Sequence, residues 1–267
     1  MLERQTPRRP RIFRPLSRVA EITKGKIVPV YKGEGDILLL WGYGGTQQRA
    51  AFEAHRKSGR HVVAIDLGYW DRGEGGIRFA LDAWHPTPED WEVACRKIKP
   101  GYEEPPLDDS YYDPAGHVLI AGLGKKSRRL LGFDGMAWEH SQVKMIREAF
   151  PGRRIVYRPK PNHEETIQGA DSGMAGTINE NLRGAALAVC LHSNVAIDCA
   201  LLGIPCLAYD GVGRYGYGKG NAAAPIRLTG AARSRFLHGV SWFNWQPVGF
   251  GQMVDFIYEL IEARNVK

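Results

Sequence analysis

The stretch 187–205 constrains the fold of this chain more than any other part of it. Residues 187–191 are all apolar, and a short polar turn leads at once into a second apolar run that ends at Gly203. An unbroken apolar run of this length is typical of a strand buried on both faces, as in a parallel sheet covered by helices. We therefore predict a strand, a helix over 194–202 and a further strand over 205–209, as in a doubly wound α/β protein.

The rest of the chain repeats this alternation of strands and helices. A glycine-rich loop, with Gly44 and Gly45, joins a first strand to a helix that Thr46 is expected to cap, which is the order of a βαβ unit with parallel strands. The further strands are predicted at 37–41, 61–66, 117–121 and 154–157, and the further helices at 46–58, 88–98, 136–149, 231–239 and 251–264.

An acidic, proline-rich stretch over 103–113 predicts a linker. The expected architecture is α/β, with two Rossmann-like lobes, parallel sheets and a cleft between the lobes. The expected parts are a basic arm over 1–30, an N-terminal lobe over 31–114 and a C-terminal lobe over 115–267. Pro7, Pro10 and Pro15 argue against a stable helix in the arm.

The composition is that of an ordinary globular protein, with 43% hydrophobic and 24% charged residues. No apolar run reaches the roughly 18 residues of a membrane-spanning helix, and the N-terminus lacks the apolar stretch of a secretory signal. We therefore expect a cytoplasmic protein, in the host cytoplasm if a phage encodes it. The four cysteines form neither a CxxC pair nor a Cys/His spacing, which favours reduced core thiols over a metal site.

The positive charge is concentrated at one end of the chain. The formal net charge is +7, and residues 1–30 hold eight Lys or Arg against two Glu, which leaves a net charge of +1 for residues 31–267. A basic arm attracts polyanions such as nucleic acid through counterion release. The alternative is a solvated tail that aids solubility.

Three polar turns are candidate sites for an anion. His192, Ser193 and Asn194 follow a predicted strand and open a helix whose N-terminus favours negative charge. Arg158 and Lys160 follow another strand and are held by two prolines, which suits the recognition of a phosphate. The alternatives are ordinary helix caps, with His192 a satisfied core residue, and a basic surface turn.

The loop 122–126 is a weaker signal, because it contains Gly-x-Gly and lacks the P-loop pattern. In a doubly wound sheet it would still lie beside the other two turns. The complete set of predicted donor-binding residues is Gly44, Gly45, Gly122, Lys125, Arg158, Lys160, His192, Ser193, Asn194 and Asp198.

The N-terminal half offers candidates for a general base that takes a proton from a hydroxyl. They are Asp66, Asp71 and His85. The alternatives for these residues are a helix cap or a salt bridge with Arg72. Nearby aromatic rings can stack on a sugar or a base, or can fill the core, and these are Tyr69, Trp70 and Trp84.

Three motifs of the C-terminal half resemble the nucleotide-sugar domain of GT-B glycosyltransferases, especially the capsule-polysaccharide type. They are Arg158-Pro159-Lys160-Pro161, His192-Ser193-Asn194 and Leu201-Leu202-Gly203-Ile204-Pro205. The resemblance covers about 117–251 and implies that Arg158, Lys160, His192 and Ser193 hold the diphosphate of the donor. The family usually has His where Lys160 stands here.

The N-terminal half is similar to proteins that are common in tailed phages, through 66–70 and 84–86. This likeness implies a phage enzyme that glycosylates a hydroxymethylated pyrimidine in DNA, and the basic arm fits that acceptor. The expected reaction is metal-independent transfer of a sugar from a nucleotide-sugar to a hydroxyl, with no further cofactor. Three alternatives stay open: a polysaccharide or lipid-linked glycan as acceptor, a sugar-nucleotide 2-epimerase, and a noncatalytic DNA-binding protein.

Overall fold

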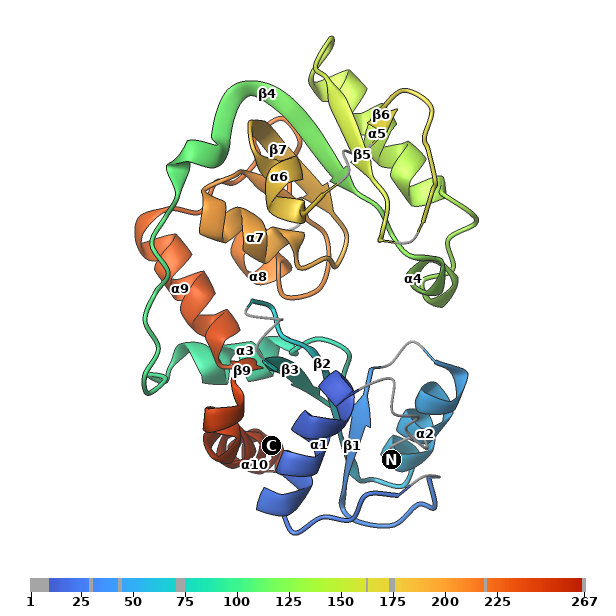
Figure 1. Ribbon diagram of the computed structural model, residues 1–267, viewed down its shortest axis with the longest axis vertical. Coiled ribbons are helices and arrows are strands. Elements are labelled where there is room, and N and C mark those ends of the chain that lie inside the picture. Colours follow the sequence, from blue (N-terminus) through green and yellow to red (C-terminus); the bar gives the residue numbers. More distant parts are fainter. Residues whose placement is uncertain are drawn as a thin grey trace. The chain divides into compact units, whose positions relative to one another are not determined.

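The computed structural model describes residues 10–28, 31–42, 45–70, 75–161, 163–172, 176–218 and 220–265 (Figure 1). These residues form two compact units. The first unit comprises the described residues up to Tyr102 together with those from His238 onward, and the second unit runs from Glu103 to Leu237. The division differs from the expected boundary at 114 and from an expected lobe that continues to the C-terminus.

The first unit contains a four-stranded sheet in the order β1-β2-β3-β9. Its strands are β1 (Ile37–Trp41), β2 (His61–Leu67), β3 (Ile77–Leu81) and β9 (Asn244–Trp245). The first two are parallel, as predicted, whereas β3 is antiparallel to both of its neighbours. The expectation of a wholly parallel sheet is wrong here. The connection between β2 and β3 is too short for the crossover of a dozen or more residues that parallel strands need.

Three helices pack on this sheet or near it: α1 (Pro10–Ile22), α2 (Thr46–Lys57) and α10 (Phe250–Asn265). Helix α2 packs Phe52 against Leu38, Leu40 and Val62 of the sheet. Its N-cap is Gly45, and Thr46 is the first helical residue, so the predicted cap is shifted by one. Helices α1 and α10 contact each other and line, with β1, a cavity of about 540 Å³.

Helix α1 contradicts the expectation that prolines prevent a helix in the arm. Pro10 is its first residue, where the missing N–H has no partner within a helix in any case. Pro15 lies inside the helix and removes one backbone hydrogen bond. Leu16 and Val19 are 4% and 1% exposed, and their burial offsets that loss.

Lys99 and Arg264 join the C-terminal segment of the first unit to the part of that unit that precedes Glu103. Lys99 Nζ donates to Ser241 O (2.5 Å) and to Asn244 O (2.8 Å). Arg264 pairs with Asp82 at 2.9 Å and with Asp90 at 2.6 Å, and both carboxylates are almost completely buried. The remaining elements of this unit are α3 (Pro88–Cys95), which a capping box of Thr87 and Asp90 starts, and the short 3-10 helix η2 (Pro247–Gly249). The boundary between the units falls inside α9 (Gly230–Ser241).

The second unit is built on a wholly parallel sheet in the order β6-β5-β4-β7-β8. Its strands are β4 (Tyr112–Ala121), β5 (Ile155–Arg158), β6 (Asp171–Ser172), β7 (Ala185–Cys190) and β8 (Cys206–Ala208). This arrangement confirms the strands predicted at 117–121, 154–157, 187–191 and 205–209. The two-residue strand β6 was not predicted.

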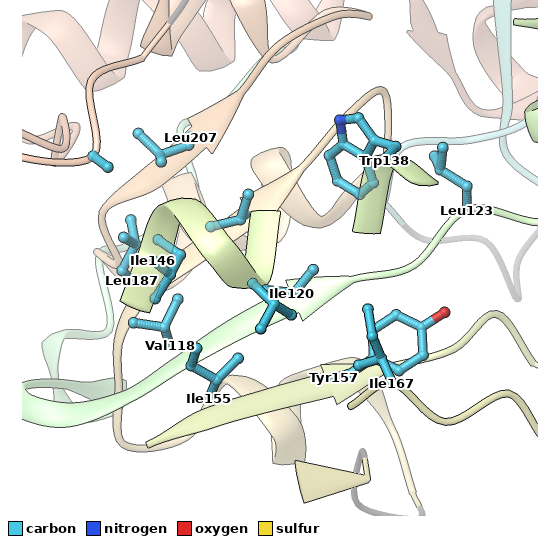
Figure 2. Packing of buried hydrophobic residues seen from close by; sticks show 13 residues of the cluster. Val118, Ile120, Leu123, Trp138, Ile146, Ile155, Tyr157, Ile167, Leu187 and Leu207 are labelled. Carbon is cyan, nitrogen blue, oxygen red and sulfur yellow. The ribbon is translucent and has the colours of Figure 1, made fainter. Parts of the chain in front are cut away.

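Helices cover this sheet. They are α4 (Lys125–Leu130), α5 (Ala137–Ala149), α6 (Ile178–Leu182), α7 (Val195–Leu202) and α8 (Arg214–Tyr217), with the 3-10 helix η1 (Asp109–Tyr111) before β4. Figure 2 shows Trp138 and Ile146 of α5 near Ile120 of β4, in one buried cluster with Tyr157 of β5.

Helix α7 is apolar almost all round and ends at Gly203, whose φ of 63° is the left-handed conformation that glycine favours. Cys190, Cys199 and Cys206 are free and buried, which confirms the prediction of core thiols for these three, whereas Cys95 is free and only partly buried. In the described part of the chain, none of the helices combines the length and the apolar character needed to cross a membrane.

The strand order places a topological switch point between β4 and β7. From β4 the chain continues to β5 and β6 on one side, and then crosses to β7 and β8 on the other. Ligands of open parallel sheets bind at such a point, outside the carboxyl ends of the strands. A ligand site is therefore expected at the segments that follow β4, β5 and β7.

Candidate functional site

Three predicted segments meet at the switch point of the second unit. Gly124 lies in the loop after β4, and a Cβ added there would be 3.6 Å from Cγ of Lys160, which follows β5. His192, which follows β7, has its Nε2 atom 3.2 Å from Ser127 Oγ of α4. The segment from Gly124 to Ser127 therefore lies beside both Lys160 and His192. The structure brings together Gly122, Lys125, Lys160, His192 and Ser193 at one edge of the sheet.

The turn between β7 and α7 is half-buried, so other parts of the second unit leave it accessible. Ser193 Oγ accepts a long hydrogen bond of 3.4 Å from Val195 N, which is weak capping. Asn194 occupies the N-cap position and makes no capping hydrogen bond with its side chain. Of the two predicted caps, only Ser193 takes part in capping. The positive end of the helix dipole at this turn still favours an anion.

Asp198 lies in the first turn of α7 and is half-buried. A carboxylate there stabilises the helix, but it repels an anion bound at the same end. Its predicted role in donor binding is untested, and its charge places it apart from the cationic members of the set.

Two glycines allow the segments of the site to approach closely. A Cβ at Gly122 would lie 2.4 Å from Tyr157 Oη, so no side chain fits there. Gly211 follows β8 with φ of +67°, and a Cβ there would be 3.3 Å from His192 Cα. Sequence reasoning missed Gly211. The available signal was a glycine just after a predicted strand at the same sheet edge.

Arg158 and Lys160 come from the end of β5, and both are half-buried. Arg158 Nη2 donates to Gly176 O at 2.9 Å, so its guanidinium also supports the segment before α6. Lys160 lies beside Gly124, as described above. Lys125 is exposed at the start of α4. The cations of this edge suit a ligand with phosphate or carboxylate groups.

The predicted base candidates of the first unit converge on a residue that the sequence did not single out. Arg78 of β3 has Nη2 3.3 Å from Asp66 Oδ2 and Nη1 3.4 Å from His85 Nδ1. Because guanidinium can only donate, His85 Nδ1 is the acceptor in that contact. The guanidinium of Arg78 also lies 5.2 Å from the centre of the Tyr69 ring. Arg78 was missed because β3 was not predicted.

Other predicted residues fall elsewhere. Asp71, Gly44 and the proposed partner Arg72 lie outside the described residues. Gly45 precedes α2 in the first unit, whereas the other described donor candidates belong to the second unit. Asp66 does form an ion pair, but with Arg78. Within the described ranges, no group of three or more His, Cys, Asp or Glu side chains could hold a metal ion.

Comparison with known proteins gives a fold and no family. No protein-family model and no curated protein matches the chain. Among solved structures, this chain is similar to "Thermosulfurimonas dismutans KpsC, beta Kdo 2,4 transferase". The match covers 93% of this chain and 96% of that chain, with a TM-score of 0.51 and 15% identity. The chain shares this fold. A second match is "Thermosulfurimonas dismutans KpsC, beta Kdo 2,7 transferase", with 86% of each chain covered, a TM-score of 0.55 and 17% identity.

Proposed function

We propose that the protein is a glycosyltransferase that moves a sugar from a nucleotide-sugar to a hydroxyl of a glycan. The observation that carries the proposal is the accessible cationic edge at the switch point of the second unit, where Lys160 and His192 follow β5 and β7 and Lys125 begins α4. Its support from comparison is the fold shared over most of both chains with two structures described as Kdo transferases. The two units would be the two lobes of a GT-B enzyme.

In this proposal the second unit binds the donor. Lys160 and Lys125 neutralise the phosphate that leaves, and the dipole of α7 adds to their effect. His192 is held by Ser127 at 3.2 Å and can donate a hydrogen bond to a phosphate oxygen when it is protonated or in the matching tautomer. Since cations and a helix N-terminus supply the stabilisation, the proposed reaction needs no metal ion.

The first unit would supply the base. Asp66 is 42% exposed, so a hydroxyl can reach its carboxylate, and Arg78 orients it. The carboxylate takes the proton of the acceptor hydroxyl while the acceptor oxygen bonds to the anomeric carbon. The bond between that carbon and the donor phosphate breaks, and its electrons go to the phosphate oxygen. Asp71 is the other carboxylate candidate for this role, and His85 can take the proton only when its Nδ1 atom gives up the contact with Arg78.

A polysaccharide or lipid-linked glycan is the proposed acceptor, in place of the DNA pyrimidine expected from the sequence. Neither solved structure is described as a phage or DNA-modifying protein. The basic arm that was expected to contact DNA is in part a packed helix, since α1 contacts α10 and buries Leu16 and Val19. Residues 1–9 lie outside the described part of the chain.

Nucleotide binding tests the proposal directly. We expect one of CMP, UDP and GDP to raise the melting temperature of the protein, and Lys160→Gln to weaken that nucleotide about tenfold or more through loss of a charged contact. The control is Lys144→Gln, because the Lys144 side chain is 81% exposed on α5 of the same unit. Absence of any shift with all three nucleotides, or an equal loss in both variants, would contradict the proposal. Conversion of a nucleotide-sugar without an acceptor would indicate an epimerase instead.

A further inference from the structure

A buried ion cluster lies next to the candidate donor site. Arg128 of α4 makes two parallel hydrogen bonds to Glu165, from Nη1 at 2.7 Å and from Nη2 at 2.8 Å. Its Nε and Nη2 atoms also donate to Glu139 Oε1 of α5, at 2.9 and 2.6 Å. The side chains of Arg128, Glu139 and Glu165 are 6%, 0% and 19% exposed. Because the nitrogen atoms of the guanidinium donate to these two carboxylates, Arg128 is not itself a ligand for a substrate anion.

The cluster joins the segments that carry the site. Glu139 Oε1 also accepts a hydrogen bond from Leu123 N at 2.9 Å, in the loop between β4 and α4. Glu165 follows the turn that contains Lys160, and Arg128 follows Lys125 on α4. Leu123 in the loop after β4 is bonded to Glu139 of α5, and Glu165 in the segment after β5 is bonded to Arg128, whose guanidinium also binds Glu139.

Helix α4 depends on such an anchor. It is six residues long, and its N-cap, Gly124, offers no side-chain hydrogen bond. A helix of this length is not stable by itself in water. Ser127, which bonds with His192, and Lys125 both lie on this helix. Both residues therefore lie on a short helix that is anchored through Arg128.

Stability alone does not account for a cluster of this kind. Buried ion pairs are costly to desolvate, and apolar residues of similar volume often replace them with no loss of stability. Glu139 Oε2 is buried with no hydrogen-bond partner among the described residues, which adds to that cost. What the planar, bidentate guanidinium supplies is a fixed geometry.

We propose that Arg128 and Glu139 are positioning residues of the donor site, and the inference rests on the function proposed above. They hold the loop after β4 and helix α4 so that Lys125 and the Ser127–His192 pair face the phosphate of the nucleotide. Glu165 also holds Arg128, because it accepts hydrogen bonds from Nη1 and Nη2 of the same guanidinium. None of the three needs to touch the ligand.

The test separates positioning from stability with an apolar replacement. In the triple variant Arg128→Met, Glu139→Leu, Glu165→Leu, we expect a folded protein by circular dichroism at 25 °C whose Kd for the nucleotide rises about tenfold. The control is Glu148→Gln, because Glu148 lies on α5, the helix of Glu139, and its side chain is 67% exposed. A folded triple variant that binds the nucleotide as tightly as the parent protein overturns the inference.

A second measurement does not depend on a ligand, and it also serves if the triple variant fails to fold. In Glu139→Gln, amide hydrogen exchange over 123–131 should become at least tenfold faster, with little change over 185–190 of β7. Unchanged exchange over 123–131 would overturn the inference even if the protein binds nucleotide. If the parent protein binds none of the three nucleotides, the proposed function fails by itself, and accelerated exchange would still show that the cluster anchors the loop.

Discussion

Each unit holds a largely buried cation, and the two cations have different kinds of partner. Arg128 of the second unit lies between the carboxylates of Glu139 and Glu165, and the hydrogen bonds that it donates to Glu165 raise its pKa. Among the described residues, the Nζ atom of Lys99 in the first unit lies against two backbone carbonyls and the face of Trp245, whose ring centre is 3.6 Å from Nζ. Burial lowers the pKa of Lys99 to about 7.

Arg128 and Lys99 therefore show two different roles of a buried charge. Arg128 stays ionised at every pH at which the protein folds, so its directional bonds are available to fix the geometry of a neighbouring site. Lys99 can lose its proton near neutral pH and still donate to both carbonyls as an amine. It serves as a fastening for the C-terminal segment. Substitutions in the two units should lower the free energy of unfolding by different amounts, with the largest effect next to Arg128 and the smallest at Asp66.

Removing one carboxylate from Arg128 should have the largest effect. Glu139→Leu leaves part of a buried guanidinium without its partner and Leu123 N without its acceptor. We expect the free energy of unfolding, measured by urea denaturation, to fall by about 3–5 kcal/mol. Glu148→Leu, at an exposed position of the same helix, should change it by less than about 0.5 kcal/mol. A loss below about 1 kcal/mol for Glu139→Leu would show that the cluster is not a buried unit.

A methyl group at Gly122 should have the next largest effect. It would overlap Tyr157 Oη, which is 3.4 Å from Arg128 Nη2 and therefore belongs to the surroundings of the same cluster. Gly122→Ala should cost about 1–3 kcal/mol in urea denaturation because the packed side chain must move. Gly251→Ala is the control, since a Cβ there meets nothing within 4 Å. Equal stability of the two variants would contradict the close approach at Gly122.

Lys99 should make stability depend on pH. Its pKa in the folded protein is about 7, against 10.5 for an unperturbed lysine. Between these values the unfolded chain binds more protons than the folded protein, so stability rises with pH. From pH 7 to pH 9 the gain should be about 2 kcal/mol, and Lys99→Met should abolish it. Lys144→Met should leave the pH profile as it is. If the stability of the parent protein does not rise over this range, the pKa of Lys99 is not lowered in the folded protein.

The ion pair of Asp66 should matter least to stability. Its carboxylate is 42% exposed, and such pairs contribute at most about 1 kcal/mol. If Asp66 is the base, Asp66→Asn should nonetheless lower kcat about 100-fold in a sugar-transfer assay. Asp255→Asn, at an exposed position of α10, provides the comparison. Full activity of Asp66→Asn would leave Asp71 and His85 as the remaining candidates.

The sequence predicts those parts of the fold that local patterns determine. The apolar run of β7, the polar turn after it and the stop at Gly203 all appear in the structure as predicted. Strand β3 was not predicted, because Arg78 interrupts its apolar residues and the glycine-rich sequence 73–76 precedes it. Helix α1 was not predicted, because its stability comes from the burial of Leu16 and Val19 and not from its proline-containing sequence.

The candidate site shows the same limit. Lys160 and His192 were predicted because each follows a recognisable strand. Arg128 was not, because its neighbours are basic and such a run usually forms a solvated surface. Its partners Glu139 and Glu165 lie on other elements, so only the tertiary structure shows that the three side chains meet. The return of the C-terminal segment to Lys99 is equally a long-range contact.

That return has a consequence for how the protein is made on the ribosome. The second unit is a continuous stretch of chain, so it can fold as soon as it has been synthesised. The first unit cannot close until β9 and α10 have emerged, because β9 completes its sheet and Arg264 neutralises Asp82 and Asp90. A nascent chain stalled before Asn244 should therefore present an unpaired edge of β3, and this intermediate is the one most exposed to aggregation.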